Sequence, residues 1–288
     1  MNGIFPSPRF KRGSKPSWKL SGQIRTDPDM YTVGIDIGSV TAKGALMSGD
    51  ALLASQACFT GYNAGAAARK IYDRLLADNQ VSPSDVHGVV ATGYGRNSVP
   101  FADRTFTEIM CHAAGARYLN SAIRVVIDIG GQDSKAIILG EGGNVVNFAM
   151  NDKCAAGTGR FLEVMARAME VDLDNFGALS LVSENPAKIS SLCAVFAESE
   201  VVSLIAGGEK RENIISGIHE SIASRVAAMA ARLGVAPAAS IMMTGGVAKN
   251  IGVVYAMEKA LGYPISVSPH AQMTGAIGAA RLASSAFY

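Results

Sequence analysis

The chain has 288 residues, 49% of them hydrophobic and 17% charged, an ordinary composition for a folded protein with a large core and room for two domains. Its net charge of +2 argues against a dedicated nucleic-acid binder, and no run of about 18 apolar residues predicts a membrane span. The four cysteines lack the regular spacing of a disulfide framework, so we expect a reducing, cytoplasmic location.

The basic excess lies in the first 30 residues, which contain six Lys or Arg residues and four prolines. This segment has little apolar content and lacks the hydrophobic region of a signal peptide. We expect residues 1–30 to form a disordered arm. A docking arm for an acidic partner is the alternative.

Two β-hairpins with nearly the same pattern head the rest of the chain. Residues 31–47 have the pattern of an apolar strand, a turn of Asp, Gly and hydroxyl residues, and a second strand, and residues 125–138 repeat this order. Three residues of each hairpin match at a constant offset of 92 positions: Asp36 and Asp128, Gly38 and Gly130, and Lys43 and Lys135. An internal repeat of this kind predicts two related halves, which we place at residues 31–122 and 123–288.

The segments between and after the hairpins alternate between helix and strand. Helical patterning covers residues 64–79, 105–121, 213–233 and 275–285, and two further helices follow Cys154 and Cys193. Strands are expected at residues 89–92, 240–244 and 264–267. Strands that alternate with helices, in halves that begin with a hairpin, predict an α/β fold with mixed sheets. We expect the last helix, from about residue 274, to pack back on the first half.

The two hairpin turns have the composition of phosphate-binding loops. Because glycine allows close approach, the amides of an Asp-x-Gly turn can contact phosphate oxygens, as can the helix start after Thr244-Gly245-Gly246. Asp36 and Asp128 cannot bind phosphate directly, and their expected task is to hold waters on Mg²⁺. Either turn alone could be a plain hairpin, but their repetition favours a nucleotide site. The expected nucleotide-binding residues are Gly38, Ser39, Thr41, Lys43, Gly130, Gly131, Asp133, Lys135, Thr244, Gly245, Gly246, Val247 and Lys249.

Two cysteines lie just before amphipathic helical runs. Cys154 sits in a small-residue turn and Cys193 precedes a second run, so both are expected near helix N-termini, where unpaired amides favour a thiolate. Two such cysteines are half of a four-thiolate metal site. The alternative is a pair of buried structural cysteines without a metal. Cys58 and Cys111 have no partner spacing, and we expect both to be core or incidental thiols.

These motifs together resemble the actin, sugar kinase and Hsp70 ATPase fold, in which two domains close over ATP. A finer resemblance is to the BadF/BadG/BcrA/BcrD ATPase family, in particular to activators of 2-hydroxyacyl-CoA dehydratases, with the ATP-binding subunits of benzoyl-CoA reductase as near relatives. The segments that carry the resemblance are residues 91–97, 128–133, 151–162, 195–201 and 243–248.

The resemblance implies ATP or ADP with Mg²⁺ in the cleft and one [4Fe–4S] cluster held by Cys154 and Cys193 of two subunits, in a homodimer or a pseudo-symmetric heterodimer. It also implies that ATP hydrolysis drives a low-potential electron from ferredoxin or flavodoxin to an acyl-CoA dehydratase or, alternatively, to benzoyl-CoA reductase subunits. Asp36, Asp128 and Gln132 are the expected catalytic residues, with Gln132 orienting the attacking water. A small-molecule kinase of the same fold and a non-catalytic assembly protein are the other classes, and the two cysteines argue against both.

Overall fold

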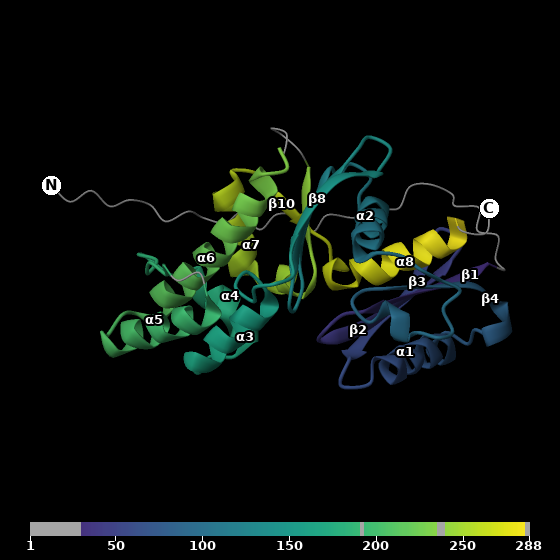
Figure 1. Cartoon of the computed structure of the whole chain (residues 1–288), viewed down its shortest axis with the longest axis horizontal. Coiled ribbons are helices and arrows are strands. Elements are labelled where there is room, and N and C mark those ends of the chain that lie inside the picture. The colour runs from purple at the N-terminus through teal and green to yellow at the C-terminus, as the bar shows by residue number, and fades with distance from the viewer. Residues whose placement is uncertain (1–29, 191–192, 235–239, 286–288) are drawn as a thin grey trace.

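Two five-stranded mixed sheets, each flanked by helices, follow one another along the molecule (Figure 1). The computed structural model describes residues 30–190, 193–234 and 240–285, so the expected N-terminal arm lies outside the described residues. The predicted α/β architecture with mixed sheets is confirmed. Within the described ranges, no helix is long and apolar enough to cross a membrane.

The first sheet has the strand order β3-β2-β1-β4-β5. Its strands are β1 (Tyr31–Ile37), β2 (Thr41–Ser48), β3 (Ala51–Phe59), β4 (Val86–Thr92) and β5 (Arg104–Thr105). Helix α1 (Ala64–Asp78) packs Ile71 and Leu75 against Val33 on one face of the sheet. Successive residues of a strand point to opposite faces, so Thr32 faces the other way, where its Oγ1 donates a 3.0 Å hydrogen bond to the carbonyl of Ala280. Helix α8 (Thr274–Ser285) therefore covers that second face.

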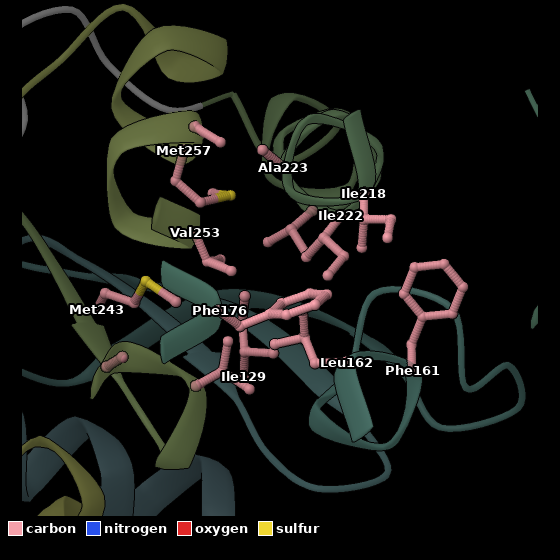
Figure 2. Packing of buried hydrophobic residues seen from close by; sticks show 14 of the residues in the cluster. Ile129, Phe161, Leu162, Phe176, Ile218, Ile222, Ala223, Met243, Val253 and Met257 are labelled. Atoms are coloured by element: carbon pink, nitrogen blue, oxygen red, sulfur yellow. The ribbon is translucent and has the colours of Figure 1, made fainter. Parts of the chain in front are cut away.

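The second sheet has the strand order β10-β9-β6-β7-β8. Its strands are β6 (Val125–Ile129), β7 (Ser134–Leu139), β8 (Val145–Asn151), β9 (Ile241–Thr244) and β10 (Ile265–Val267). The largest apolar cluster fills the space between this sheet and helices α6 (Arg211–Ala231) and α7 (Ile251–Leu261). Figure 2 shows Ile218 and Ile222 of α6 converging with Val253 of α7 above Ile129 of β6.

Helix α2 (Glu108–Leu119) lies between the two sheets. Its Ile109 and Ala113 share an apolar cluster with Val126 of the second sheet, whereas its Cys111 packs with Ala279 of α8. The helix thereby links both halves, with its first turn at their boundary. The division at residues 122 and 123 stays a prediction.

Strand β8 and helix α4 (Leu173–Ser180) were not among the predicted elements, and of β3 only a strand around Cys58 was expected. Both strands lie at sheet edges, and most of their residues are exposed or half-buried. An edge strand needs little apolar alternation, because neither of its faces is fully covered. Each predicted hairpin is therefore part of a three-stranded antiparallel meander.

The two cysteine-bearing helices begin differently. Cys193 is the N-cap residue of α5 (Ala194–Ala206), whereas Cys154 lies in a turn that leads to Thr158, the N-cap of α3 (Gly159–Ala168). The glycine turn after β9 also differs from the expectation, because Gly246–Lys249 form a 3₁₀ turn before α7 begins. Cys154 therefore lies near the N-terminus of α3, as expected, but is separated from it by the turn at residues 155–158.

Candidate functional site

A cleft of about 680 Å³ lies between the two halves. Its walls come from both hairpin turns, the glycine turn after β9, and the first turn of α2. It contains all but one of the predicted nucleotide-binding and catalytic residues: Asp36, Gly38, Ser39, Thr41, Lys43, Asp128, Gly130, Gly131, Gln132, Asp133, Lys135, Gly245, Gly246, Val247 and Lys249. The exception is Thr244, which is fully buried behind the wall.

The two hairpin turns have the same internal geometry and meet each other. The amide of Gly38 donates to the carbonyl of Thr41 at 3.1 Å, and the amide of Gly130 donates to the carbonyl of Asp133 at 2.9 Å. A Cβ atom placed on Gly131 would lie only 2.7 Å from Val40 Cγ2, so the second turn rests against the first. A phosphate chain in the cleft would therefore meet both turns.

The internal repeat extends to a feature that the constant offset does not reveal. Asp36 lies opposite Thr92 on the parallel neighbour of β1, and Asp128 lies opposite Thr244 on the parallel neighbour of β6. A glycine follows each threonine, with φ of +85° at Gly93 and +87° at Gly245. The positive φ of each glycine turns the chain beside the aspartate. A residue with a side chain would disfavour this backbone conformation. The loops between aspartate and threonine differ in length, so the offset of 92 is lost at Thr92 and Thr244.

In the first half, the aspartate and the lysine of the hairpin form a partly buried pair. Lys43 Nζ lies 3.1 Å from Asp36 Oδ2, and the two residues face each other across β1 and β2. The turn above them is braced by Thr60, whose amide donates to Val40 and whose Oγ1 donates to the Gly38 carbonyl. Lys43 is therefore positioned directly beneath the first turn, where a Cβ on Gly38 would be 3.0 Å from its Nζ.

In the second half, the corresponding lysine is surrounded by three carboxylates. The Lys135 side chain is 1% exposed, and its Nζ lies 2.8 Å from Asp133, 3.1 Å from Glu108 and 3.3 Å from Asp128. Burial alone would lower the pKa of Lys135, but the three carboxylates raise it, so the ammonium stays charged. Lys135 thus balances acidic side chains, and its expected part in nucleotide binding stays a prediction.

Asp128 is held as a carboxylate by its surroundings. Thr244 Oγ1 donates to its Oδ1 at 2.8 Å, and His112 Nδ1 lies 3.3 Å from the same oxygen. Burial would raise the pKa of Asp128, but the electrostatic interactions with His112 and Lys135 and the hydrogen bonds from Thr244 and Lys135 lower it to about 2. Both carboxylate oxygens of Asp128 are thus engaged by protein groups.

Glu108 and His112 were not among the predicted site residues, although both line the cleft. They lie four positions apart on α2 and so share one helix face, which is the sequence signal that could have identified them. Glu108 reaches Lys135 but keeps a side chain that is 23% exposed to the cleft. Burial raises the pKa of Glu108, which places a carboxylate of increased basicity beside the two turns.

The two predicted cluster cysteines lie at accessible positions on the second half. Cys154 is half-buried and Cys193 is exposed. Cys58 is half-buried in β3, and Cys111 is buried in α2, where burial raises the pKa of its thiol to about 12. Among the described residues, no group of three or more His, Cys, Asp or Glu side chains is arranged to hold a metal ion.

Helix α5 leaves an apolar surface beside Cys193. Only Ala197 and Val201 of this helix are buried, whereas Val195, Phe196, Val202 and Ile205 are exposed. The first turns of α3 and α5 contain no acidic residue, so the positive ends of both helix dipoles are not compensated there.

The fold and the paired phosphate-type turns define a nucleotide-binding protein of the actin-like ATPase class. Within that class, the chain belongs to the BadF/BadG/BcrA/BcrD ATPase family, which its residues 33–283 match. A ROK family glucokinase from Streptomyces griseus, with a TM-score of 0.54 and 15% identity over 88% of this chain and 99% of that chain, shares the fold alone.

Relatives within the family are considerably more similar. The activator of lactoyl-CoA dehydratase from Anaerotignum propionicum is 46% identical over 252 residues, which cover 87% of this chain and 96% of the relative. The structure of the activator of 2-hydroxyisocaproyl-CoA dehydratase from Clostridium difficile, with bound ADPNP, has a TM-score of 0.83 and 43% identity, over 89% of this chain and 95% of that chain. One of the subunits of benzoyl-CoA reductase from Thauera aromatica is 37% identical over 221 residues, or 74% of this chain and 77% of the relative.

Proposed function

We propose that this chain is the ATP-hydrolysing activator of a 2-hydroxyacyl-CoA dehydratase, which passes a low-potential electron to that enzyme. The observation that carries the proposal is the presence, in one half of the molecule, of a phosphate-type turn and two cysteines that are not fully buried, one in the turn before α3 and one at the N-cap of α5. The similarity to dehydratase activators over most of the chain supports the choice of acceptor.

ATP would lie in the cleft, with its phosphates between the two turns and its adenosine towards Gly245 and Gly246. Mg²⁺ usually keeps several waters and is held by one or two carboxylates together with phosphate oxygens. Asp36 fits such a water-mediated contact, because only its Oδ2 is bound by Lys43. The engaged oxygens of Asp128 fit it less well, and we propose that Asp128 instead holds β6 and β9 together beneath the second turn.

Hydrolysis requires a side chain that orients the attacking water. Gln132 is exposed at the tip of the second turn and remains a candidate for this role. Glu108 is the second candidate, since its raised pKa makes its carboxylate a better proton acceptor than an ordinary glutamate. Lys135 fixes the orientation of Glu108 through their 3.1 Å ion pair.

Cys154 and Cys193 fit one half of a shared [4Fe–4S] site. Cys154 is half-buried and Cys193 is exposed, and the N-terminal end of α5, which Cys193 caps and whose first turn has no acidic residue, favours an anionic ligand set. Because four thiolates are needed, a second copy or a paralogue must supply two of them, and the apolar surface of α5 offers a contact area beside Cys193. The cluster would serve as a one-electron carrier, and its donor would be ferredoxin or flavodoxin in the cytoplasm.

An iron assay tests the proposal. Protein purified without oxygen should contain about two irons per chain, as four-cysteine ligation across a dimer requires. Cys154→Ala and Cys193→Ala should each lose the iron yet still bind ATP, whereas Cys58→Ala should keep both properties, because Cys58 lies in the first half on β3. Wild-type protein that is free of iron and phosphorylates a small metabolite would overturn the proposal in favour of a kinase.

Membership of a benzoyl-CoA reductase is the second candidate function, favoured by the similarity to a subunit of that enzyme. The two candidates differ in how firmly the partner is bound. Native purification should yield this chain as a dimer by itself if it is an activator. A stable complex with further subunits would favour the reductase.

A further inference from the structure

We propose that Cys154, and not Cys193, is the cysteine fixed directly to the phosphate turn, so that the nucleotide state is transmitted to the thiols through residues 151–160. We call this segment the Cys154 bracket. The inference rests on the proposed function and adds to it the route by which the nucleotide controls the cysteines. It is carried by hydrogen bonds at both ends of the bracket and within it.

The first end of the bracket is attached to the beginning of β7. Asn151 pairs with Ser134, the residue that directly follows the second turn. From there the Asn151 side chain reaches over the cysteine turn, accepting from the Cys154 amide at 3.2 Å and donating to the Cys154 carbonyl at 2.8 Å. The peptide groups on either side of Cys154 are thus held by a residue that is itself held by the turn.

The second end is attached to the turn itself. The amide of Gly159 donates to the carbonyl of Gly130, and the amide of Arg160 donates to the carbonyl of Gly131, both at 2.8 Å. These amides belong to the first turn of α3 and have no partner within the helix. A Cβ on Gly159 would lie 3.2 Å from the Gly130 carbonyl oxygen, which explains why a glycine begins this helix.

The middle of the bracket is braced as well. Thr158 is fully buried, and both its amide and its Oγ1 donate to the carbonyl of Ala155. Few torsions between Cys154 and Gly159 are therefore left without a hydrogen-bonded constraint. A displacement of the turn at residues 130–134 pulls on both ends of this short segment and must move Cys154 with it.

Cys193 is attached to the molecule in a different way. It caps α5, and Ser190, three positions before it, donates through its amide and its hydroxyl to the Glu200 carboxylate in the middle of that helix. Helix α5 lies against α3 and α6, and its Ala197 and Val201 belong to the apolar cluster that these helices share. Cys154 is held to the turn by backbone hydrogen bonds, whereas Cys193 is held by the packing of α5. The two thiols can therefore move relative to each other when the turn moves.

The first half contains a comparable brace that is connected to neither Cys154 nor Cys193. There Thr60 braces the first turn through Gly38 and Val40, and the chain then leads to helix α1. Thr60→Val removes the hydroxyl bond to Gly38 and therefore serves as a comparison in which a phosphate turn is loosened at a place that leads to neither Cys154 nor Cys193.

Hydrogen exchange of the wild-type protein tests the inference without any substitution. With ADP and then with a non-hydrolysable ATP analogue, the exchange rates of peptides that cover residues 128–134 and residues 151–160 should change together. Bracket amides that exchange at the same rate in both states would overturn the inference, whether or not the turn responds.

A pair of substitutions at Arg160 tests the same link in the iron-loaded protein. Proline is tolerated in the first turn of a helix and has no amide hydrogen, so Arg160→Pro removes the bond to Gly131. Arg160→Ala removes the same side chain, with its exposed ion pair to Glu163, and keeps the amide. The readout is the rate at which a ferrous chelator removes iron, compared between the ATP analogue and ADP.

The ratio of these two rates should fall about fivefold in Arg160→Pro, the equivalent of one net hydrogen bond, and should be unchanged in Arg160→Ala. Thr60→Val should weaken nucleotide binding, but at saturating nucleotide it should keep the wild-type ratio of the two iron-removal rates. Equal ratios in all variants would overturn the inference while leaving the iron-dependent function intact. Iron-free wild-type protein would overturn the proposed function, and the hydrogen-exchange result would then decide the inference alone. If Arg160→Pro fails to fold, the hydrogen-exchange result on the wild-type protein likewise decides the inference.

Discussion

Thr244 Oγ1 donates a 2.8 Å hydrogen bond to Asp128 Oδ1, and this bond joins the ends of β9 and β6 beneath the second turn. The equivalent residue of the first half, Thr92, donates instead to the neutral carbonyl of Phe106. Two threonines at matching places in the repeat therefore support a buried charge in one half and a neutral acceptor in the other.

This difference predicts unequal losses of stability. Thr244→Val should lower the free energy of unfolding by about 2 kcal/mol, because a buried carboxylate loses a donor, whereas Thr92→Val should lower it by about 1 kcal/mol. Urea denaturation at pH 7 measures both values. Equal losses would contradict a special role for the charged acceptor.

His219 should make the stability depend on pH well above the range of the carboxylates. Burial lowers the pKa of His219 to about 3 from 6.5, and among the described residues its Nδ1 has no hydrogen-bond partner. The unfolded chain then binds the proton more readily than the folded one. Stability is complete above pH 6.5 and falls as the pH falls towards 3, by at most about 1.4 kcal/mol per pH unit.

The variant His219→Gln removes this ionisation and keeps a polar group that can meet Asn250. Its stability should change less between pH 7 and pH 5 than that of the wild type, as measured by urea denaturation at each pH. Asp128 cannot produce the same effect, because its lowered pKa contributes only below its unfolded value of 3.8. Identical profiles would show that His219 is not the group responsible.

The two candidates for orienting the attacking water can be separated by kinetics. If Glu108 accepts the proton, Glu108→Gln should lower the kcat for ATP hydrolysis about a hundredfold with little change in nucleotide affinity. Gln132→Ala should then have a much smaller effect, since Gln132 is exposed at the turn. The reverse order of effects would assign the water to Gln132.

The apolar surface of α5 should be needed for dimer formation. Phe196→Asp places a charge on an exposed residue near Cys193 and should give a monomer with low iron content. Val182→Asp is the matched control, because Val182 is 66% exposed against 68% for Phe196 but lies after α4, away from both cysteines in the chain. Sedimentation at several protein concentrations measures the oligomeric state. A dimeric Phe196→Asp variant would place the interface elsewhere.

The sequence alone was sufficient to predict those functional features whose residues lie close together in the chain. The Asp-x-Gly turns, the lysines seven positions after each aspartate, and the glycines after Thr244 are short-range arrangements, and the cleft brings nearly all of them together. The short apolar runs of buried strands such as β1 and β6 and the helical periodicity of α1 are local signals in the same sense.

The other features of the site depend on contacts between residues that are far apart in the sequence. The three carboxylates around Lys135 come from α2, β6 and the second turn, so no local pattern could show that this lysine balances acids. The equivalence of Thr92 and Thr244 appears only in the pairing of parallel strands, because the intervening segments differ in length. The attachment of the Cys154 bracket likewise depends on backbone groups of Gly130 and Gly131, which every residue type possesses and which only packing can bring into register with α3.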